Sequence, residues 1–190
     1  DYSIPLPMSL PEEIFNRISS YKDNPKSYSI GFLGSVGKHS ESRYTLIEEI
    51  ASYYPDSLLQ AAPVSETEGK HPDERVGLDS YYDNLQRCRA VLTLRGAGYD
   101  TLRFWENAAC NALHVSETMP LFIPDDFEDK RDIIRFSDID QLRKVIDSHL
   151  SGSEETDQII KSSNQHLKNY HLTTKRAIYF LDRIKRAFDN

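Results

Sequence analysis

The chain has 190 residues, enough for one domain with a proper core, and its 38% hydrophobic and 28% charged residues are ordinary for a soluble globular protein. Its net charge of -7 argues against non-specific binding to nucleic acid or to an anionic membrane. We expect no membrane span, because no apolar run approaches the roughly 20 residues that a spanning helix needs. The two cysteines, Cys88 and Cys110, are too few for a disulfide scaffold and favour a reducing, cytoplasmic location.

Residues 1–26 are expected to form a linker and a helix that leads into the domain. Ser9 and Glu12 have the spacing of a capping box, which predicts a helix that ends near Tyr21. Because the chain begins with Asp1 rather than Met, we expect it to be a piece of a longer polypeptide.

Residues 27–150 alternate the signals of strands and helices. The expected strands are residues 27–35, 58–62, 90–94, 113–116 and 132–136. The expected helices include residues 40–54, 78–89 and 138–150, the last of them capped by Ser137, and residues 63–77 are expected to form a polar surface loop. This alternation predicts a three-layer α/β, Rossmann-like domain with a mostly parallel sheet.

Residues 151–190 are expected to add two C-terminal helices that pack on this domain, over residues 154–170 and 173–188. The second helix carries apolar residues at helical spacing, which predicts that it packs on the core through Ile178, Leu181, Ile184 and Phe188.

The segment that follows the strand 90–94 has the pattern of an anion site. Gly96 and Gly98 come directly after the strand, and Asp100 or Thr101 then offers an N-cap oxygen to a helix. A strand, a glycine turn and a helix N-terminus bring unpaired backbone N–H groups and a positive dipole end to one point. That point favours an anion such as a diphosphate.

The helix that begins there is amphipathic. Trp105 belongs to its apolar stripe, so we expect this side chain to be buried. Arg95 precedes the turn and Arg103 lies about one turn into the helix, so two guanidinium groups can flank an anion. Glu106 shares the polar face one turn further on, where a carboxylate could accept from a pair of sugar hydroxyls.

This segment resembles the donor-site motif of GT-B glycosyltransferases, most closely their exostosin-like and spore-coat-glycosyltransferase-like branches. The matching residues are Arg95-Gly96-x-Gly98-x-Asp100-Thr101-x-Arg103-x-x-Glu106-x-x-Ala109-Cys110. The resemblance implies the C-terminal, donor-binding half of a GT-B fold, which binds a nucleotide sugar for transfer to a hydroxyl of a glycan or another acceptor. It also implies that Glu106 holds the ribose hydroxyls, and that Arg95, the two glycines and the helix start lie near the diphosphate.

Two positions depart from the family pattern. Asn111 stands where the family has glycine, and of the non-glycine residues asparagine best tolerates the left-handed conformation that such a helix end needs. Gly98 stands where many GT-B enzymes carry a second glutamate, so one family contact to the sugar is missing.

A second loop is expected to line the donor cleft. In the resembled family, a strand, a Gly-Ser loop and an arginine stand in the places of Ser35, Lys38 and Arg43 and line the cleft. The alternative interpretation of the same residues is a solvated loop with exposed charges.

We expect no metal site. The acidic run at residues 125–129 has no His or Cys at ligand spacing, and such runs are usually solvated. Asp138 and Asp140 imitate an Asp-x-Asp metal motif, but they lie in the first turn of an amphipathic helix, where they complement its dipole. His171, Thr173 and Arg176 resemble a family segment that is mainly structural.

Two functional hypotheses follow. The first is the donor-binding half of a glycosyltransferase, with an N-terminal GT-B half or a partner chain that supplies any general base, so that no catalytic residue is assigned to this chain. No cofactor is implied, since the nucleotide sugar is the substrate. The second is a degenerate, non-catalytic α/β module that binds a nucleotide or a protein partner, and Asn111 and Gly98 are the residues that favour it.

Overall fold

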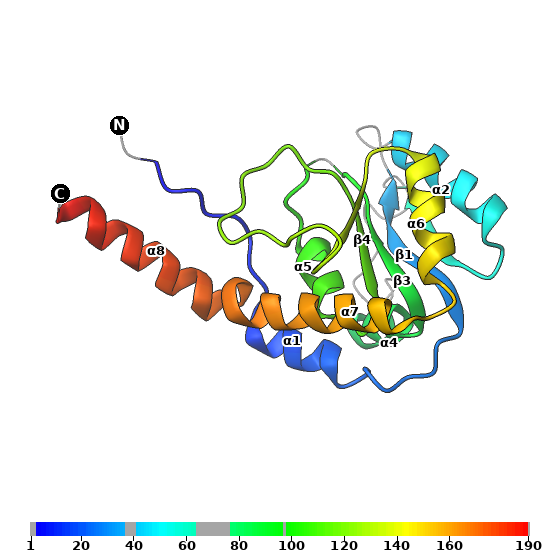
Figure 1. Cartoon of the computed structure of the whole chain (residues 1–190), viewed down its shortest axis with the longest axis horizontal. Helices are drawn as coiled ribbons and strands as arrows, with labels where there is room; N and C mark the ends of the chain where they lie inside the picture. The colour runs from blue at the N-terminus through cyan, green and yellow to red at the C-terminus, as the bar shows by residue number, and fades with distance from the viewer. Residues whose placement is uncertain (1–2, 37–40, 64–76, 97, 190) are drawn as a thin grey trace.

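The computed structural model of the chain describes residues 3–36, 41–63, 77–96 and 98–189 (Figure 1). The strands are β1 (Tyr28–Val36), β2 (Leu58–Pro63), β3 (Cys88–Thr93), β4 (Leu113–Glu117) and β5 (Ile134–Phe136). The helices are α1 (Glu12–Ser19), α2 (Glu41–Tyr53), α4 (Leu78–Gln86), α5 (Leu102–Ala109), α6 (Ile139–His149), α7 (Glu154–His166), the π-helical η2 (Leu167–His171) and α8 (Thr173–Phe188).

The described strands form one sheet in the order β2-β1-β3-β4-β5, and each neighbouring pair is parallel. The predicted fold class is therefore confirmed. A parallel sheet is covered on both faces, which explains why its strands appear in the sequence as short apolar runs rather than as alternating patterns. The strand order reverses direction beside β1, because β2 lies on one side of it and β3 on the other.

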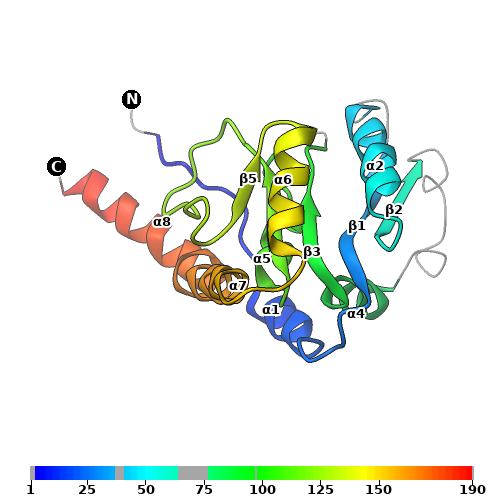
Figure 2. The ribbon, with the colours of Figure 1, turned by 45° about the vertical axis from the view of Figure 1, so that its right-hand side comes forward.

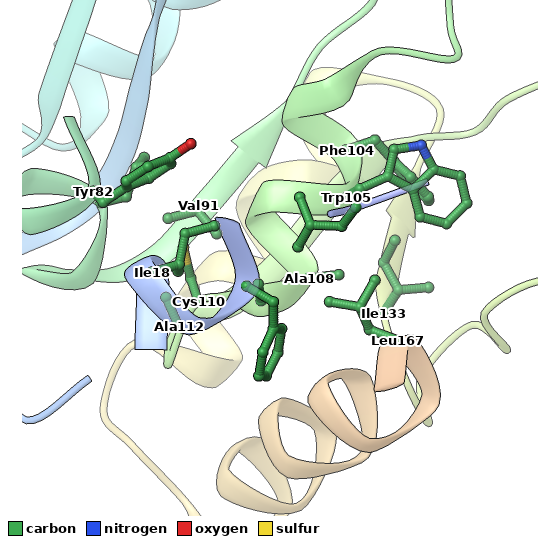
Figure 3. Close-up of a cluster of buried hydrophobic side chains, with 14 of the residues drawn as sticks. Ile18, Tyr82, Val91, Phe104, Trp105, Ala108, Cys110, Ala112, Ile133 and Leu167 are labelled. Carbon is green, nitrogen blue, oxygen red and sulfur yellow. The ribbon is translucent and has the colours of Figure 1, made fainter. Parts of the chain in front are cut away.

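Helices cover both faces of the sheet (Figure 2). On one face α2 and α6 contribute Ile50 and Ile146 to a buried cluster. On the other face α1, α4 and α5 contribute Ile18, Leu85 and Trp105 to a second cluster, part of which Figure 3 shows. Trp105 is 0% exposed, which confirms the helix phase predicted for α5.

The strand β3 begins at Cys88, two residues before the expected start, because α4 ends at Gln86. Arg87 follows α4 with φ of -82° and donates from Nε to the Asp83 carboxylate at 2.9 Å. Cys88, which lies within the range expected to be helical, is buried on the strand β3. The local sequence favours helix through this junction, and pairing of Cys88 with Tyr28 of β1 overrides it.

The predicted capping box before α1 is wrong. Pro11 occupies the N-cap position, and Ser9 and Glu12 contact the other end of the chain instead. The Ser9 hydroxyl lies 3.2 Å from the Thr173 hydroxyl, and the Glu12 carboxylate accepts from the Thr174 N–H at 3.1 Å. Leu10 adds two backbone hydrogen bonds, donating to the His171 carbonyl at 3.1 Å and accepting from the Thr173 N–H at 3.0 Å.

The cap of α6 also differs from the expectation. Asp138, not Ser137, is the N-cap residue, and its Oδ1 accepts from the Gln141 N–H at 2.8 Å. Ser137 instead donates its own N–H to the Gln141 side chain at 2.8 Å. Asp138 therefore acts as a helix cap with a charge that suits the helix N-terminus.

The C-terminal helix α8 extends away from the sheet (Figure 1). The prediction that its apolar stripe packs on the core is wrong for three of the four residues, since Ile178 is 49%, Leu181 62% and Phe188 87% exposed. Helical periodicity shows that a helix has an apolar side but does not show what that side faces. Among the helices of the described ranges, none is long and apolar enough to cross a membrane.

Candidate functional site

The candidate site lies where the order of the strands reverses, between β1 and β3. In a parallel α/β sheet, the loops after two such strands lead to opposite faces and leave a crevice beyond the strand ends. The helices that follow these strands are α2 and α5, so their first turns lie at that edge. Residues 37–40, including Lys38, lie outside the described residues. Ser35 is part of the backbone of β1, and its side chain is likewise outside the described part.

Two arginines converge on the ring of Phe32, a residue of β1. The guanidinium carbon of Arg43, from α2, lies 5.5 Å from the ring centroid, and that of Arg103, from α5, lies 5.0 Å from it. Arg43 also donates from Nε to the Arg95 carbonyl at 2.9 Å and from Nη2 to the Leu94 carbonyl at 3.0 Å. Arg43 therefore links the start of α2 to the segment that follows β3.

The two guanidinium groups concentrate positive charge in a partly buried place. Burial lowers the pKa of Arg43, the charge of Arg103 lowers it further, and the carboxylate of Glu117 acts in the opposite direction. Arg103 Nε is buried, and among the described residues no acceptor lies within hydrogen-bonding range of it. A buried donor without a partner is costly, and an anion at this place would supply the missing acceptor.

Two glycines make room for these side chains. A Cβ atom at Gly34 would lie 2.7 Å from Arg103 Nη2, and one at Gly96 would lie 2.6 Å from Arg43 Nη2. The resemblance implied only that Gly96 lies near the diphosphate, whereas the structure gives a steric reason for this glycine, the packing of Arg43. At Gly98 a Cβ would meet no atom of the described residues within 4 Å, and the Gly98 carbonyl accepts from the Gly96 N–H at 3.1 Å.

The remaining motif residues of the turn have contacts within the chain. Both carboxylate oxygens of Asp100 accept hydrogen bonds, from the Met8 N–H at 2.7 Å and from Trp105 Nε1 at 3.1 Å. Thr101 is the N-cap residue of α5 by its extended backbone, without a capping side-chain bond in the described residues. Arg95 stacks on the ring of Tyr99, 4.8 Å from its centroid. In the first turn of α5, the Phe104 N–H donates to the Thr101 carbonyl at 3.0 Å.

Glu106 is held by two tyrosines that sequence reasoning did not connect to it. Glu106 is 6% exposed. Its Oε1 accepts from the Tyr82 hydroxyl at 2.8 Å, and its Oε2 accepts from the Tyr81 hydroxyl at 3.2 Å. Burial raises the pKa of Glu106, while the two hydroxyls and the charge of Arg103 partly oppose that shift. No local pattern in the sequence relates these adjacent tyrosines of α4 to a residue of α5.

Asn111 is not in the left-handed conformation that was expected from its place in the motif. Among the described non-glycine residues, positive φ occurs only at Asp125 and Lys130. Asn111 instead joins three segments: its N–H donates to Gln86 Oε1 at 2.8 Å, and its side-chain amide donates to the Lys22 carbonyl at 3.0 Å. The helix end tolerates a side chain here because its backbone does not require glycine.

The acidic run after β4 is used in ion pairs and turns. Asp126 pairs with Arg135 at 2.9 Å, and the Asp129 carboxylate accepts from the Arg135 N–H at 2.8 Å. Within the described ranges, no group of three or more His, Cys, Asp or Glu side chains is arranged to hold a metal ion.

The fold is that of a Rossmann-like α/β domain, and Arg43 and Arg103 lie where the order of its parallel strands reverses. The sequence model of a family described as glycosyl transferase-like matches residues 43–182, well over half of the chain, and the chain belongs to that family. The resemblance seen in the sequence is thereby confirmed at the level of the family.

A solved structure is similar in fold. It is the C-terminal domain of a glycosyl transferase group 1 family protein, LpcC, from Francisella tularensis, with a TM-score of 0.54 and 14% identity over 85% of this chain and 95% of that chain. No protein among curated sequences matches the chain.

Proposed function

We propose that the chain is the donor-binding half of a GT-B glycosyltransferase that binds a nucleoside-diphosphate sugar for transfer to an acceptor hydroxyl. The observation that carries this proposal is the convergence of Arg43 and Arg103 on Phe32 at the strand reversal, where the buried Nε of Arg103 has no acceptor among the described residues. Membership of the glycosyl transferase-like family supports it.

In this proposal the residues of the chain stabilise the leaving group. The departing nucleoside diphosphate gains negative charge. Arg43, Arg103 and the N-terminal dipole of α5 stabilise that charge without need of a metal ion. Glu106 accepts from the ribose hydroxyls, one helical turn beyond Arg103. A general base for the acceptor hydroxyl comes from an N-terminal half or a partner chain. The free, buried cysteines are compatible with a cytoplasmic enzyme.

The test is to titrate the protein with UDP and GDP in a calorimeter and to repeat the titration with Arg103→Ala. We expect the substitution to weaken binding of the preferred nucleotide by about 2–5 kcal/mol, because it removes a charged partner of the diphosphate. Arg143→Ala is the matched control, since Arg143 also stacks on an aromatic ring, that of Tyr53 on α2, with 3.7 Å between guanidinium carbon and centroid. Equal affinity of the wild type and Arg103→Ala, or no binding of either nucleotide, would contradict the proposal.

A further inference from the structure

Tyr81 and Tyr82 hold the Glu106 carboxylate in different ways. Tyr82 is 1% exposed and its hydroxyl lies 2.8 Å from Oε1, so it is fixed in the core. Tyr81 is half-buried, and its hydroxyl makes a longer bond, 3.2 Å, to Oε2. The two rings meet edge to face, with centroids 5.2 Å apart.

The Tyr81 hydroxyl also lies beside the arginine of the candidate diphosphate site. Burial and the charge of Glu106 raise the pKa of Tyr81. The charge of Arg103 and a side-chain hydrogen bond from it act in the opposite direction and lower that pKa. Tyr81 therefore stands between the group proposed to meet the diphosphate and the group proposed to meet the ribose.

We propose that Tyr81 occupies, in the empty site, the Glu106 acceptor that a ribose hydroxyl takes when the nucleotide binds. A buried carboxylate needs donors at all times, so a donor that leaves must be replaced. A ribose hydroxyl can replace Tyr81 at Oε2, and a diphosphate beside Arg103 offers new acceptor oxygens to the freed Tyr81 hydroxyl. Tyr82 stays in place and orients the carboxylate. Tyr81 is thus a specificity-determining residue, and this inference rests on the proposed function.

If this exchange occurs, Tyr81→Phe and Tyr82→Phe should change the affinity for nucleotide in opposite directions. We expect Tyr81→Phe to bind the preferred ribonucleoside diphosphate about 2- to 10-fold more tightly, because nothing then competes for Oε2. We expect Tyr82→Phe to bind it less tightly, because the carboxylate loses its fixed partner. Tyr54→Phe is the control. Tyr54 directly follows the C-terminal end of α2, and its hydroxyl also donates to a carboxylate, that of Asp147 on α6, at 2.7 Å.

A spectroscopic readout tests the exchange in the unsubstituted protein. With 3-fluorotyrosine incorporated, the fluorine signals of Tyr81 and Tyr82 are assigned by their loss in the Phe variants. Saturation with UDP or GDP should change the fluorine chemical shift of Tyr81 more than saturation with the 2′-deoxy nucleotide does. The chemical shift of Tyr82 should stay nearly unchanged.

The outcomes separate the two proposals. Binding with a preference for ribose, but with weaker or unchanged affinity in Tyr81→Phe and an unmoved Tyr81 signal, overturns the exchange and leaves the proposed function intact. Absence of nucleotide binding by the wild type overturns both.

Discussion

At the scale of single residues, Phe32 lets two like charges lie close together. Each guanidinium group gains about 0.5–1 kcal/mol from the face of an aromatic ring at a partly exposed site. That gain, together with the carbonyl partners of Arg43, offsets part of the repulsion between Arg43 and Arg103. In the proposed function, a diphosphate with at least two negative oxygens would remove the remaining repulsion.

Gly34 tests this arrangement without removing a charge. In Gly34→Ala the new methyl group would lie 2.7 Å from Arg103 Nη2, so the guanidinium group must move away from the ring. We expect the affinity for nucleoside diphosphate to fall about 10- to 100-fold through this displacement, with a smaller effect on thermal stability. The measurement is calorimetric titration with a thermal melt of each variant. Gly77→Ala serves as control, because a Cβ there meets no described atom within 4 Å; equal losses in both variants would refute the steric explanation.

The proposed contact between Glu106 and the ribose predicts a preference for ribonucleotides over 2′-deoxynucleotides. The wild type should bind UDP or GDP more tightly than the 2′-deoxy nucleotide by about 1–3 kcal/mol, because the analogue lacks a hydroxyl that would donate to the Glu106 carboxylate. Glu106→Gln should reduce this difference, since an amide offers one acceptor oxygen where the carboxylate offers two. Competition binding with the four nucleotides measures it. If the wild type does not distinguish ribose from deoxyribose, Glu106 serves only to hold Tyr81 and Tyr82.

At the scale of elements, α5 has two functions in eight residues. One side carries Arg103, which lies over Phe32, and Glu106, which bonds the tyrosines of α4, and the apolar side fills the cluster between α1 and the sheet. Trp105 connects the two sides, since its ring nitrogen donates to Asp100 of the motif turn while its ring lies 4.9 Å from that of His171. The position of the site residues therefore depends on how Trp105 is packed.

Trp105→Ala should reduce the free energy of unfolding by about 3–5 kcal/mol, the usual cost of truncating a large, fully buried side chain. Trp105→Phe should lose less, because it keeps most of the packing and loses mainly the bond to Asp100. Urea unfolding followed by circular dichroism gives both values. A loss below about 1 kcal/mol for the alanine variant would mean that the surrounding side chains close the cavity.

The sequence was informative about elements and less so about their partners. Short apolar runs and helical periodicity are local, so the strands, the order of helices and the burial of Trp105 could be predicted from them. The partners of Ser9 and Glu12 could not, because they lie in α8, far along the chain. The candidate site shows the same difference between local patterns and distant partners. Arg43 and Arg103 could be proposed from their places after two strands, whereas the bonds of Glu106 to two tyrosines of α4 depend on tertiary packing.

At the scale of the whole molecule, two buried histidines make stability sensitive to acid. Burial lowers the pKa of His114 and of His171 to about 3, and the charges of Arg135 and Arg176, respectively, lower it further. The unfolded chain has histidine pKa values near about 6.5. Between about pH 6.5 and pH 3, the unfolded chain binds protons that the folded chain does not, so the free energy of unfolding falls as the pH falls, by at most about 1.4 kcal/mol per pH unit and histidine.

His171→Gln should make this dependence less steep. Its Nδ1 accepts from Arg176 at 2.5 Å, a bond that a glutamine oxygen can replace without a titrating group. Urea unfolding at about pH 7, 6 and 5 gives the slope for the variant and the wild type. His149→Gln, at a half-buried histidine of α6, is the comparison. An identical slope in the His171 variant and the wild type would show that His171 is not the source of the acid sensitivity.

The two backbone bonds of Leu10 have a consequence for synthesis of the protein on the ribosome. Leu10 is made before its partners, the His171 carbonyl and the Thr173 N–H, which follow about 160 residues later. At about 5–20 residues per second, that delay is roughly 10–30 s. During this time the strands of the sheet can emerge in order, while Leu10 still lacks its partners. Leu10 therefore makes these two bonds only after the chain through Thr173 has left the ribosome, whereas α1 can pack on α4 and α5 before then.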